Sequence, residues 1–137
     1  MSDAPYAIDA DFPGGNIVVE RAGPDEALVH QDLRDTRTDW FYWCFRVRGA
    51  AGRRVRVVFT RSRAIGVRGP AVSLDEGRSW RYLGAGAVED NAFTFDFPPG
   101  ADDVRLSFGM PYQFDRWHRF AASLAGSRHF AARPLCT

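Results

Sequence analysis

A run of aromatic and charged residues at positions 39–48 places the tightest constraint on how this chain folds. Read with the two-residue period of a β-strand, one face of the run is wholly apolar and consists of Phe41, Trp43, Phe45 and Val47. The opposite face begins with Trp40 and Tyr42 and ends with Arg46 and Arg48. We therefore expect a central strand with one face in the core. The aromatic start of its other face must also be covered by another part of the protein.

Short segments with the same alternation recur along the 137 residues, and turn residues separate them. The further segments that we expect to form strands are 6–12, 17–20, 27–33, 53–60, 71–74, 78–82, 93–97 and 104–108. Residues 49–52, Gly-Ala-Ala-Gly, are expected to close a hairpin between the aromatic strand and 53–60. The arginines of that second strand suit an edge or a solvated side.

The apolar period changes only near the end of the sequence. Apolar residues at helical spacing are Phe114, Trp117, Phe120, Ala121 and Leu124, and Gly126 stands where a helix would be capped. This pattern predicts one helix over about 113–125. The whole sequence thus predicts an all-β fold, an antiparallel β-sandwich of about eight or nine strands with one C-terminal helix, as a single domain over 1–137. A parallel α/β fold is excluded, because helices do not alternate with the strands.

Composition and charge exclude several classes of partner. The chain has 18 basic residues, all arginine, against 17 acidic ones, which gives a net charge of +1. A nucleic-acid-binding protein needs a one-sided basic surface, so we expect no nucleic-acid partner. The sequence starts without a signal-peptide pattern and contains no apolar stretch of membrane length, so we expect a cytoplasmic protein with no membrane partner.

The residues that usually carry catalysis do not form a recognised pattern. His30, His118 and His129 lack a second ligand at zinc-site spacing, and the Gly-x-Ser-x-Gly motif of serine hydrolases is absent. His118 is expected to be exposed on the polar side of the helix. Cys44 lies within the aromatic strand, where a free, buried and inert thiol is expected. An enzyme that uses Cys44 or a His–Asp pair remains as an alternative hypothesis.

One short motif is specific enough to predict a local structure. Residues 73–80, Ser-Leu-Asp-Glu-Gly-Arg-Ser-Trp, match the Asp-box. In this motif Asp75 caps backbone N–H groups of a β-hairpin, Gly77 supplies a positive φ, and Trp80 packs back over the turn. The motif recurs in the blades of sialidase propellers, but it occurs here once, so we interpret it as a structural hairpin.

Several segments occur in the order found in a known family. They are 12–17 (Phe-Pro-Gly-Gly-Asn-Ile), 39–42 (Asp-Trp-Phe-Tyr), 69–73 (Gly-Pro-Ala-Val-Ser) and 108–112 (Phe-Gly-Met-Pro-Tyr). Together they resemble the N-terminal domain that precedes the catalytic domain in zinc metallocarboxypeptidases of the cytosolic carboxypeptidase type and their bacterial relatives. The resemblance implies a noncatalytic accessory domain, with the zinc ligands in a downstream peptidase domain. This chain would dock on that domain, support it and shape substrate access, and it would itself bind no cofactor.

The candidate interdomain interface consists of Trp40, Tyr42, Pro111 and Tyr112, because large exposed apolar patches mark interfaces. The alternative is that these side chains are core residues covered by the predicted helix. Separated from its partner, such a surface could also cause self-association. A second function remains open: a sandwich with four Trp residues and an Asp-box could be a carbohydrate-binding module that binds sugars on exposed rings.

Overall fold

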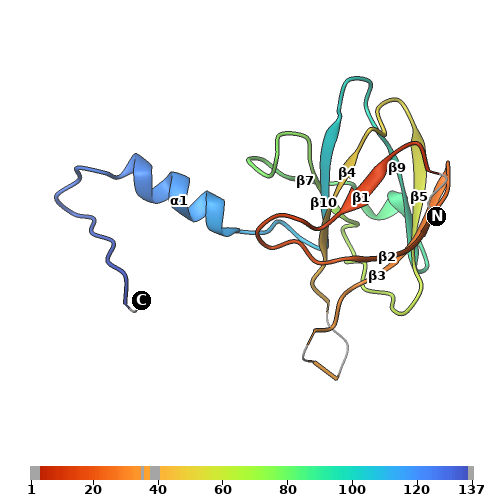
Figure 1. Cartoon of the computed structure of the whole chain (residues 1–137), viewed down its shortest axis with the longest axis horizontal. Coiled ribbons are helices and arrows are strands. Elements are labelled where there is room, and N and C mark those ends of the chain that lie inside the picture. The colour runs from red at the N-terminus through yellow and green to blue at the C-terminus, as the bar shows by residue number, and fades with distance from the viewer. Residues whose placement is uncertain (1–3, 35, 38–40, 136–137) are drawn as a thin grey trace.

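The computed structural model describes residues 4–34, 36–37 and 41–135, and within them the chain forms a two-layer β-sandwich with one helix (Figure 1). The first sheet has the strand order β1 (Ala7–Asp9), β4 (Cys44–Arg48), β10 (Asp103–Ser107), β6 (Ala71–Ser73) and β7 (Arg81–Tyr82). The second has the order β2 (Val18–Ala22), β3 (Glu26–His30), β5 (Arg54–Phe59), β9 (Ala92–Asp96) and β8 (Val88–Glu89). The predicted all-β sandwich is confirmed.

Most neighbouring strands are antiparallel, but β3 and β5 pair in parallel, with Ala27 opposite Val57. The sequence analysis also missed β8, which has two residues and follows a short 3-10 helix at Ala85–Ala87. The strand β5 has the predicted alternation, with Val55 and Val57 buried while its arginines face outward. Its solvated arginine face is as expected, although β5 lies inside the sheet between β3 and β9 and not at an edge.

The core is a cluster of aromatic rings that joins the two sheets. Trp43, directly before β4 of the first sheet, is fully buried and lies 4.9 Å from the ring of Phe59 and 6.0 Å from the ring of Phe93. Both of these partners belong to the second sheet. The indole N–H of Trp43 donates a 2.6 Å hydrogen bond to the carbonyl oxygen of Ala64, so the buried polar atom is satisfied.

The aromatic run forms a shorter strand than predicted. Because β4 begins at Cys44, Phe41 precedes the strand, and its side chain is 64% exposed and packs beside Phe108. The assignment of Phe41 to the core was therefore wrong, while Trp43, Phe45 and Val47 are buried as predicted.

The predicted hairpin at 49–52 was also wrong, because β4 and β5 belong to different sheets. The segment 49–52 instead carries the chain from one layer to the other. Each strand places its apolar face toward the same core, Phe45 and Val47 from one side and Val55 and Val57 from the other. Two strands that bury facing surfaces in this way oppose one another across the sandwich and do not pair edge to edge.

The predicted helix is present as α1, Phe114–Ser123, but it does not cover the sandwich. None of its residues is buried, and Figure 1 shows it projecting away from both sheets on the long axis of the molecule. The alternative in which α1 covers Tyr42, Pro111 and Tyr112 as core is therefore wrong. Across the described residues, no helix has the length and apolar character needed to cross a membrane.

The burial of Phe45 and the exposure of Phe41 give a matched test of the fold. Phe45→Ala should lower the free energy of unfolding by about 3–5 kcal/mol, because it leaves a cavity in the core. Phe41→Ala should cost about 1 kcal/mol or less, since the side chain is already largely exposed and packs beside Phe108. Urea denaturation of both variants measures the difference, and equal losses would contradict the position assigned to Phe41.

Candidate interdomain surface

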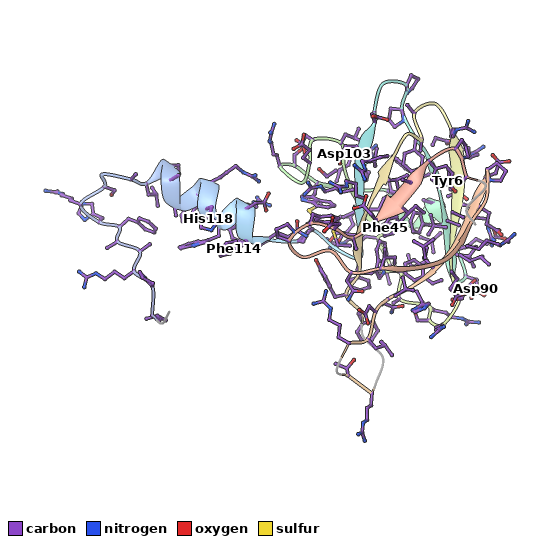
Figure 2. The ribbon with its side chains drawn as sticks, in the orientation of Figure 1. Tyr6, Phe45, Asp90, Asp103, Phe114 and His118 are labelled. Carbon is purple, nitrogen blue, oxygen red and sulfur yellow. The ribbon has the colours of Figure 1, made fainter. Side chains whose placement is uncertain are left out.

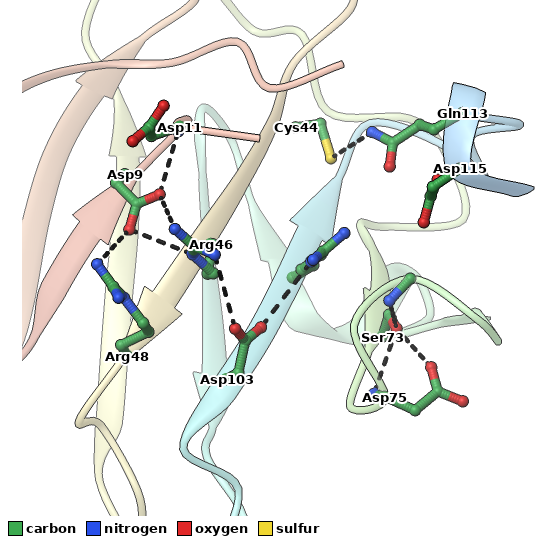
Figure 3. Close-up of polar contacts among 12 residues, drawn as sticks. Asp9, Asp11, Cys44, Arg46, Arg48, Ser73, Asp75, Asp103, Gln113 and Asp115 are labelled. Atoms are coloured by element: carbon green, nitrogen blue, oxygen red, sulfur yellow. Dashed lines mark hydrogen bonds and ion pairs between the residues drawn. The ribbon is translucent and has the colours of Figure 1, made fainter. Parts of the chain in front are cut away.

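The side chain of Gln113 joins the connector between β10 and α1 to the sandwich. The amide Nε2 of Gln113 lies 3.5 Å from the hydroxyl of Tyr42 and 3.6 Å from Sγ of Cys44, a contact drawn in Figure 3. The Tyr42 hydroxyl donates in turn to the carbonyl oxygen of Gly14. The start of the helix, the start of β4 and the loop after β1 are thus held at one point.

Gly14, in that loop, has a backbone conformation that favours glycine, and it lies close to the Gln113 side chain. Gly14 has φ +83°, and a Cβ added to it would lie 2.6 Å from the Gln113 amide nitrogen. Both the positive φ and this close approach favour glycine over any residue with a side chain. The second glycine of the Pro-Gly-Gly segment has a different constraint, since a Cβ added to Gly15 would lie 2.1 Å from the carbonyl oxygen of Ala10.

The four residues predicted for the interface have different surroundings. Gln113 links Tyr42, which is half-buried, to the connector that carries Pro111 and Tyr112. Pro111 is half-buried, whereas Tyr112 is 60% exposed, with the Arg116 guanidinium 5.3 Å from its ring centre. Trp40 lies outside the described residues. Contact of these side chains with another domain stays a prediction.

A wider set of exposed apolar side chains lies just before β4, along the connector and on the helix, and of these the sequence analysis assigned only Tyr112 to an interface. These residues are Phe41, Met110, Tyr112, Phe114, Trp117 and Phe120. Each of these side chains is between 38% and 66% exposed. The helical spacing of Phe114, Trp117 and Phe120 was recognised in the sequence. The missing information was that the sandwich offers them no apolar surface to pack against.

The outer face of the first sheet is charged, so it offers the helix no apolar surface to pack against. Arg46 donates a 2.8 Å hydrogen bond to Asp9 and lies 3.9 Å from Asp103, and Arg48 lies 3.1 Å from Asp9 (Figure 3). Partial burial alone would raise the pKa of Asp9, yet the hydrogen bonds from Arg46 and from the backbone, with the nearby positive charges, hold it below its usual value. An ionised network therefore occupies this face.

Aromatic rings on this side of the sandwich lie under arginines. The guanidinium of Arg105 lies 4.6 Å from the ring centre of Phe12, and that of Arg46 lies 5.7 Å from the same ring. The ring of Tyr82 has Arg68 at 5.7 Å. These are cation–π contacts, and they occupy ring faces that a sugar would otherwise use.

Cys44 is a buried free thiol, as predicted. Burial raises the pKa of the thiol, and its hydrogen bonds with Ser107, Gln113 and Tyr42 offset this only in part. Since the thiolate is the reactive form, a buried thiol with a raised pKa is inert. This environment argues against the alternative of a Cys44 nucleophile.

The Asp-box forms the predicted hairpin between β6 and β7. Asp75 accepts hydrogen bonds from the backbone N–H and hydroxyl of Ser79 at 2.8 and 2.6 Å, and from the hydroxyl of Ser73 at 2.8 Å. The indole of Trp80 donates to the carbonyl oxygen of Gly77, which has φ +86°. Although desolvation opposes it, the hydrogen bonding lowers the pKa of Asp75 to about 2. The motif thus stabilises the turn between β6 and β7, and we refer to this hydrogen-bonded turn as the clasp.

Metal-binding side chains do not gather within the part of the chain that the structure describes. In residues 4–34, 36–37 and 41–135, no group of three or more His, Cys, Asp or Glu is arranged to hold a metal ion. His30 lies 3.7 Å from Glu20 and 2.8 Å from the carbonyl oxygen of Gln31. His118 is exposed on the helix, as predicted, and contacts Phe114.

Neither protein-family models nor curated protein sequences match this chain, but solved structures do. The chain is similar to a metallo-carboxypeptidase from Burkholderia cenocepacia, with a TM-score of 0.70 and 18% identity over 90% of this chain and 34% of that one. It is also similar to a metallo-carboxypeptidase from Pseudomonas aeruginosa in complex with (2-guanidinoethylmercapto)succinic acid, with a TM-score of 0.67 and 23% identity over 88% of this chain and 34% of that one.

At this level of identity the comparison shows a shared fold. The chain spans about a third of the length of the carboxypeptidases that it matches. The resemblance drawn from the sequence is confirmed to this extent: the sandwich has the fold of one part of bacterial metallo-carboxypeptidase chains.

The Asp75 environment gives a prediction about pH. Because its pKa is lower in the folded chain than the ordinary value of 3.8, the stability that Asp75 contributes is present above about pH 4 and is lost as the pH falls toward 2. Asp75→Asn should therefore be less stable than the original chain at pH 6, and the difference should shrink between pH 4 and pH 2.

Urea unfolding at a series of pH values measures this difference. Glu76→Gln, an exposed residue of the same turn, is the control and should change stability little at any pH. A gap between the Asp75→Asn variant and the original chain that stays constant down to pH 2 would refute the assigned clasp.

Proposed function

We propose that this chain is a noncatalytic accessory domain, N-terminal to the peptidase domain of a zinc metallocarboxypeptidase-like protein. It docks on the peptidase domain, supports its folding and helps to shape substrate access. The observation that carries this proposal is the structural match, which covers about nine-tenths of this chain but only a third of the carboxypeptidase chains. This ratio of lengths supports the proposal that the chain is one domain of a larger protein.

The exposed side chains around the connector support docking. Tyr112 and Phe41 are 60% and 64% exposed, far more than is usual for aromatic side chains in a finished core. Patches of this kind mark protein–protein contacts. We keep Trp40, Tyr42, Pro111 and Tyr112 as the candidate interface. Among the three of them that the structure describes, Tyr112 is the most exposed.

Zinc, which the resemblance implies, does not fit the described residues of this chain. Catalytic zinc sites use three protein ligands and one open position, and no such group of donors comes together here. We therefore assign the zinc to the peptidase domain and no step of peptide hydrolysis to this chain. The proposed location of the whole protein is the cytoplasm.

The outer face of the first sheet does not favour the carbohydrate-binding alternative. Such modules use a planar row of exposed rings, whereas the outer face of the first sheet carries the Asp9–Arg46–Arg48 network and rings covered by arginines. We do not propose it further.

Two measurements test the proposed function. The 137-residue chain, incubated with zinc and peptides, should release no C-terminal residues above background. Intact bacterial metallo-carboxypeptidase is the positive control. Added to the peptidase domain encoded with it, the chain should form a 1:1 complex seen by size-exclusion chromatography with light scattering.

Two results would count against this proposal. One is zinc-dependent release of C-terminal residues by the chain alone, which would make it an enzyme. The other is the lack of any peptidase domain in the same gene or its neighbours that binds the chain.

A further inference from the structure

The helix α1 has an apolar face that the chain does not bury. Phe114, Trp117 and Phe120 lie on one side at helical spacing and are 66%, 38% and 47% exposed. Figure 2 shows Phe114 and His118 on the projecting helix, well away from the core residues Tyr6 and Phe45. Phe130 folds back to 6.2 Å from the rings of both Trp117 and Phe120, which gives only partial cover.

Local interactions do little to stabilise this helix. It has ten residues, and isolated helices shorter than about 12–15 residues are marginal in water. The N-cap residue Gln113 makes no capping hydrogen bond, because its side chain is directed to Tyr42 and Cys44. One ion pair at helical spacing, Asp115–Arg119 at 3.0 Å, lies on the polar side. A helix of this length needs a packing surface for its apolar face.

The sandwich does not supply that surface. Gln113 fixes the point where the connector leaves, and the helix then runs outward from both sheets (Figure 1). The outer face near this point is occupied by charged groups such as Arg46 and Asp9. Desolvating ion pairs under aromatic rings is costly, so a helix that swung back would find an unfavourable partner.

We propose that the Phe114–Trp117–Phe120 face of α1 inserts into an apolar groove of the peptidase domain, so that α1 is structurally part of that domain. This inference rests on the proposed function and deepens it by naming the main docking element. The matched carboxypeptidase chains are about three times as long as the part that this chain covers, so a second folded body is available to provide the groove.

A second copy of this chain is a poorer occupant. Ten residues of helix extend about 15 Å, and one face of that length offers far less than the roughly 800 Å² per partner of a stable interface. Against the peptidase domain, α1 adds to the proposed contact of Tyr42, Pro111 and Tyr112, so the helix does not have to supply the whole area by itself.

The test compares two double variants of the whole 137-residue chain. Phe114→Ser with Trp117→Ser removes the apolar face, and Val67→Ser with Ala122→Ser is the control, since Val67 is 91% exposed on the sandwich and Ala122 lies on the far side of the helix. Neither pair should lower the melting temperature, because neither touches the core. A change in binding can therefore not be attributed to unfolding of a variant.

Affinity for the peptidase domain encoded with the chain is the main readout. We expect the apolar-face variant to bind at least tenfold more weakly and the control to bind like the original chain. The fluorescence of Trp117, isolated by subtracting the signal of Trp117→Phe, should shift to shorter wavelength when the complex forms.

The other outcomes overturn the inference in distinguishable ways. Unchanged affinity of the apolar-face variant would leave docking in place but remove α1 from it. A concentration-dependent dimer that this variant abolishes would show that a second copy covers the face. Failure of every form of the chain to bind would overturn the proposed function as well.

Discussion

The structure depends on the burial of Trp43 between the two sheets. Its ring stacks on Phe93 and lies against Phe59, both from the opposite layer, and its N–H is satisfied by Ala64. A fully buried indole of this size determines which face of the neighbouring strand is internal. Every residue next to Trp43 in sequence must then follow the alternation that it imposes.

That alternation places Tyr42 and Cys44 on the outer side, where they meet Gln113 of the connector. The contact in the core thus determines where the connector is held and from which point the helix departs. The sandwich is complete without the helix, since its core cluster draws only on the strands and their loops. The aromatic face of the helix is left exposed. The proposed docking and the assignment of α1 to a neighbouring domain both rest on this separation of the helix from the core.

Much of the sandwich could be predicted from the sequence, because apolar residues at every second position indicate a strand with one buried face. The strands at 53–60, 93–97 and 104–108 and the Asp-box hairpin were predicted correctly for this reason. The connection at 49–52 was predicted wrongly. A glycine-rich turn has the same sequence pattern whether β5 pairs with β4 or crosses to the other sheet. The parallel pairing of β3 with β5 is likewise a long-range choice that no local pattern records.

The candidate surface was predicted less well. Phe41 has the period of a core residue, yet the strand starts three residues later, at Cys44, and leaves it outside. The helical period of Phe114, Trp117 and Phe120 showed that they share a face but not what covers it. The assignment of Tyr42 and Tyr112 to an interface stays a prediction. The contact of Gln113 with Tyr42 and Cys44 could not be predicted, because it joins residues that are 71 and 69 positions apart in the sequence.

Amide hydrogen exchange on the dilute, monomeric chain tests most directly whether the sandwich is complete without its helix. Amides of β4, β5, β9 and β10 should be strongly protected because they open only with global unfolding, while those of α1 should exchange nearly as fast as in an unfolded chain. Protection of α1 equal to that of the core strands would show that its aromatic face is buried within this chain, and would contradict its assignment to another domain.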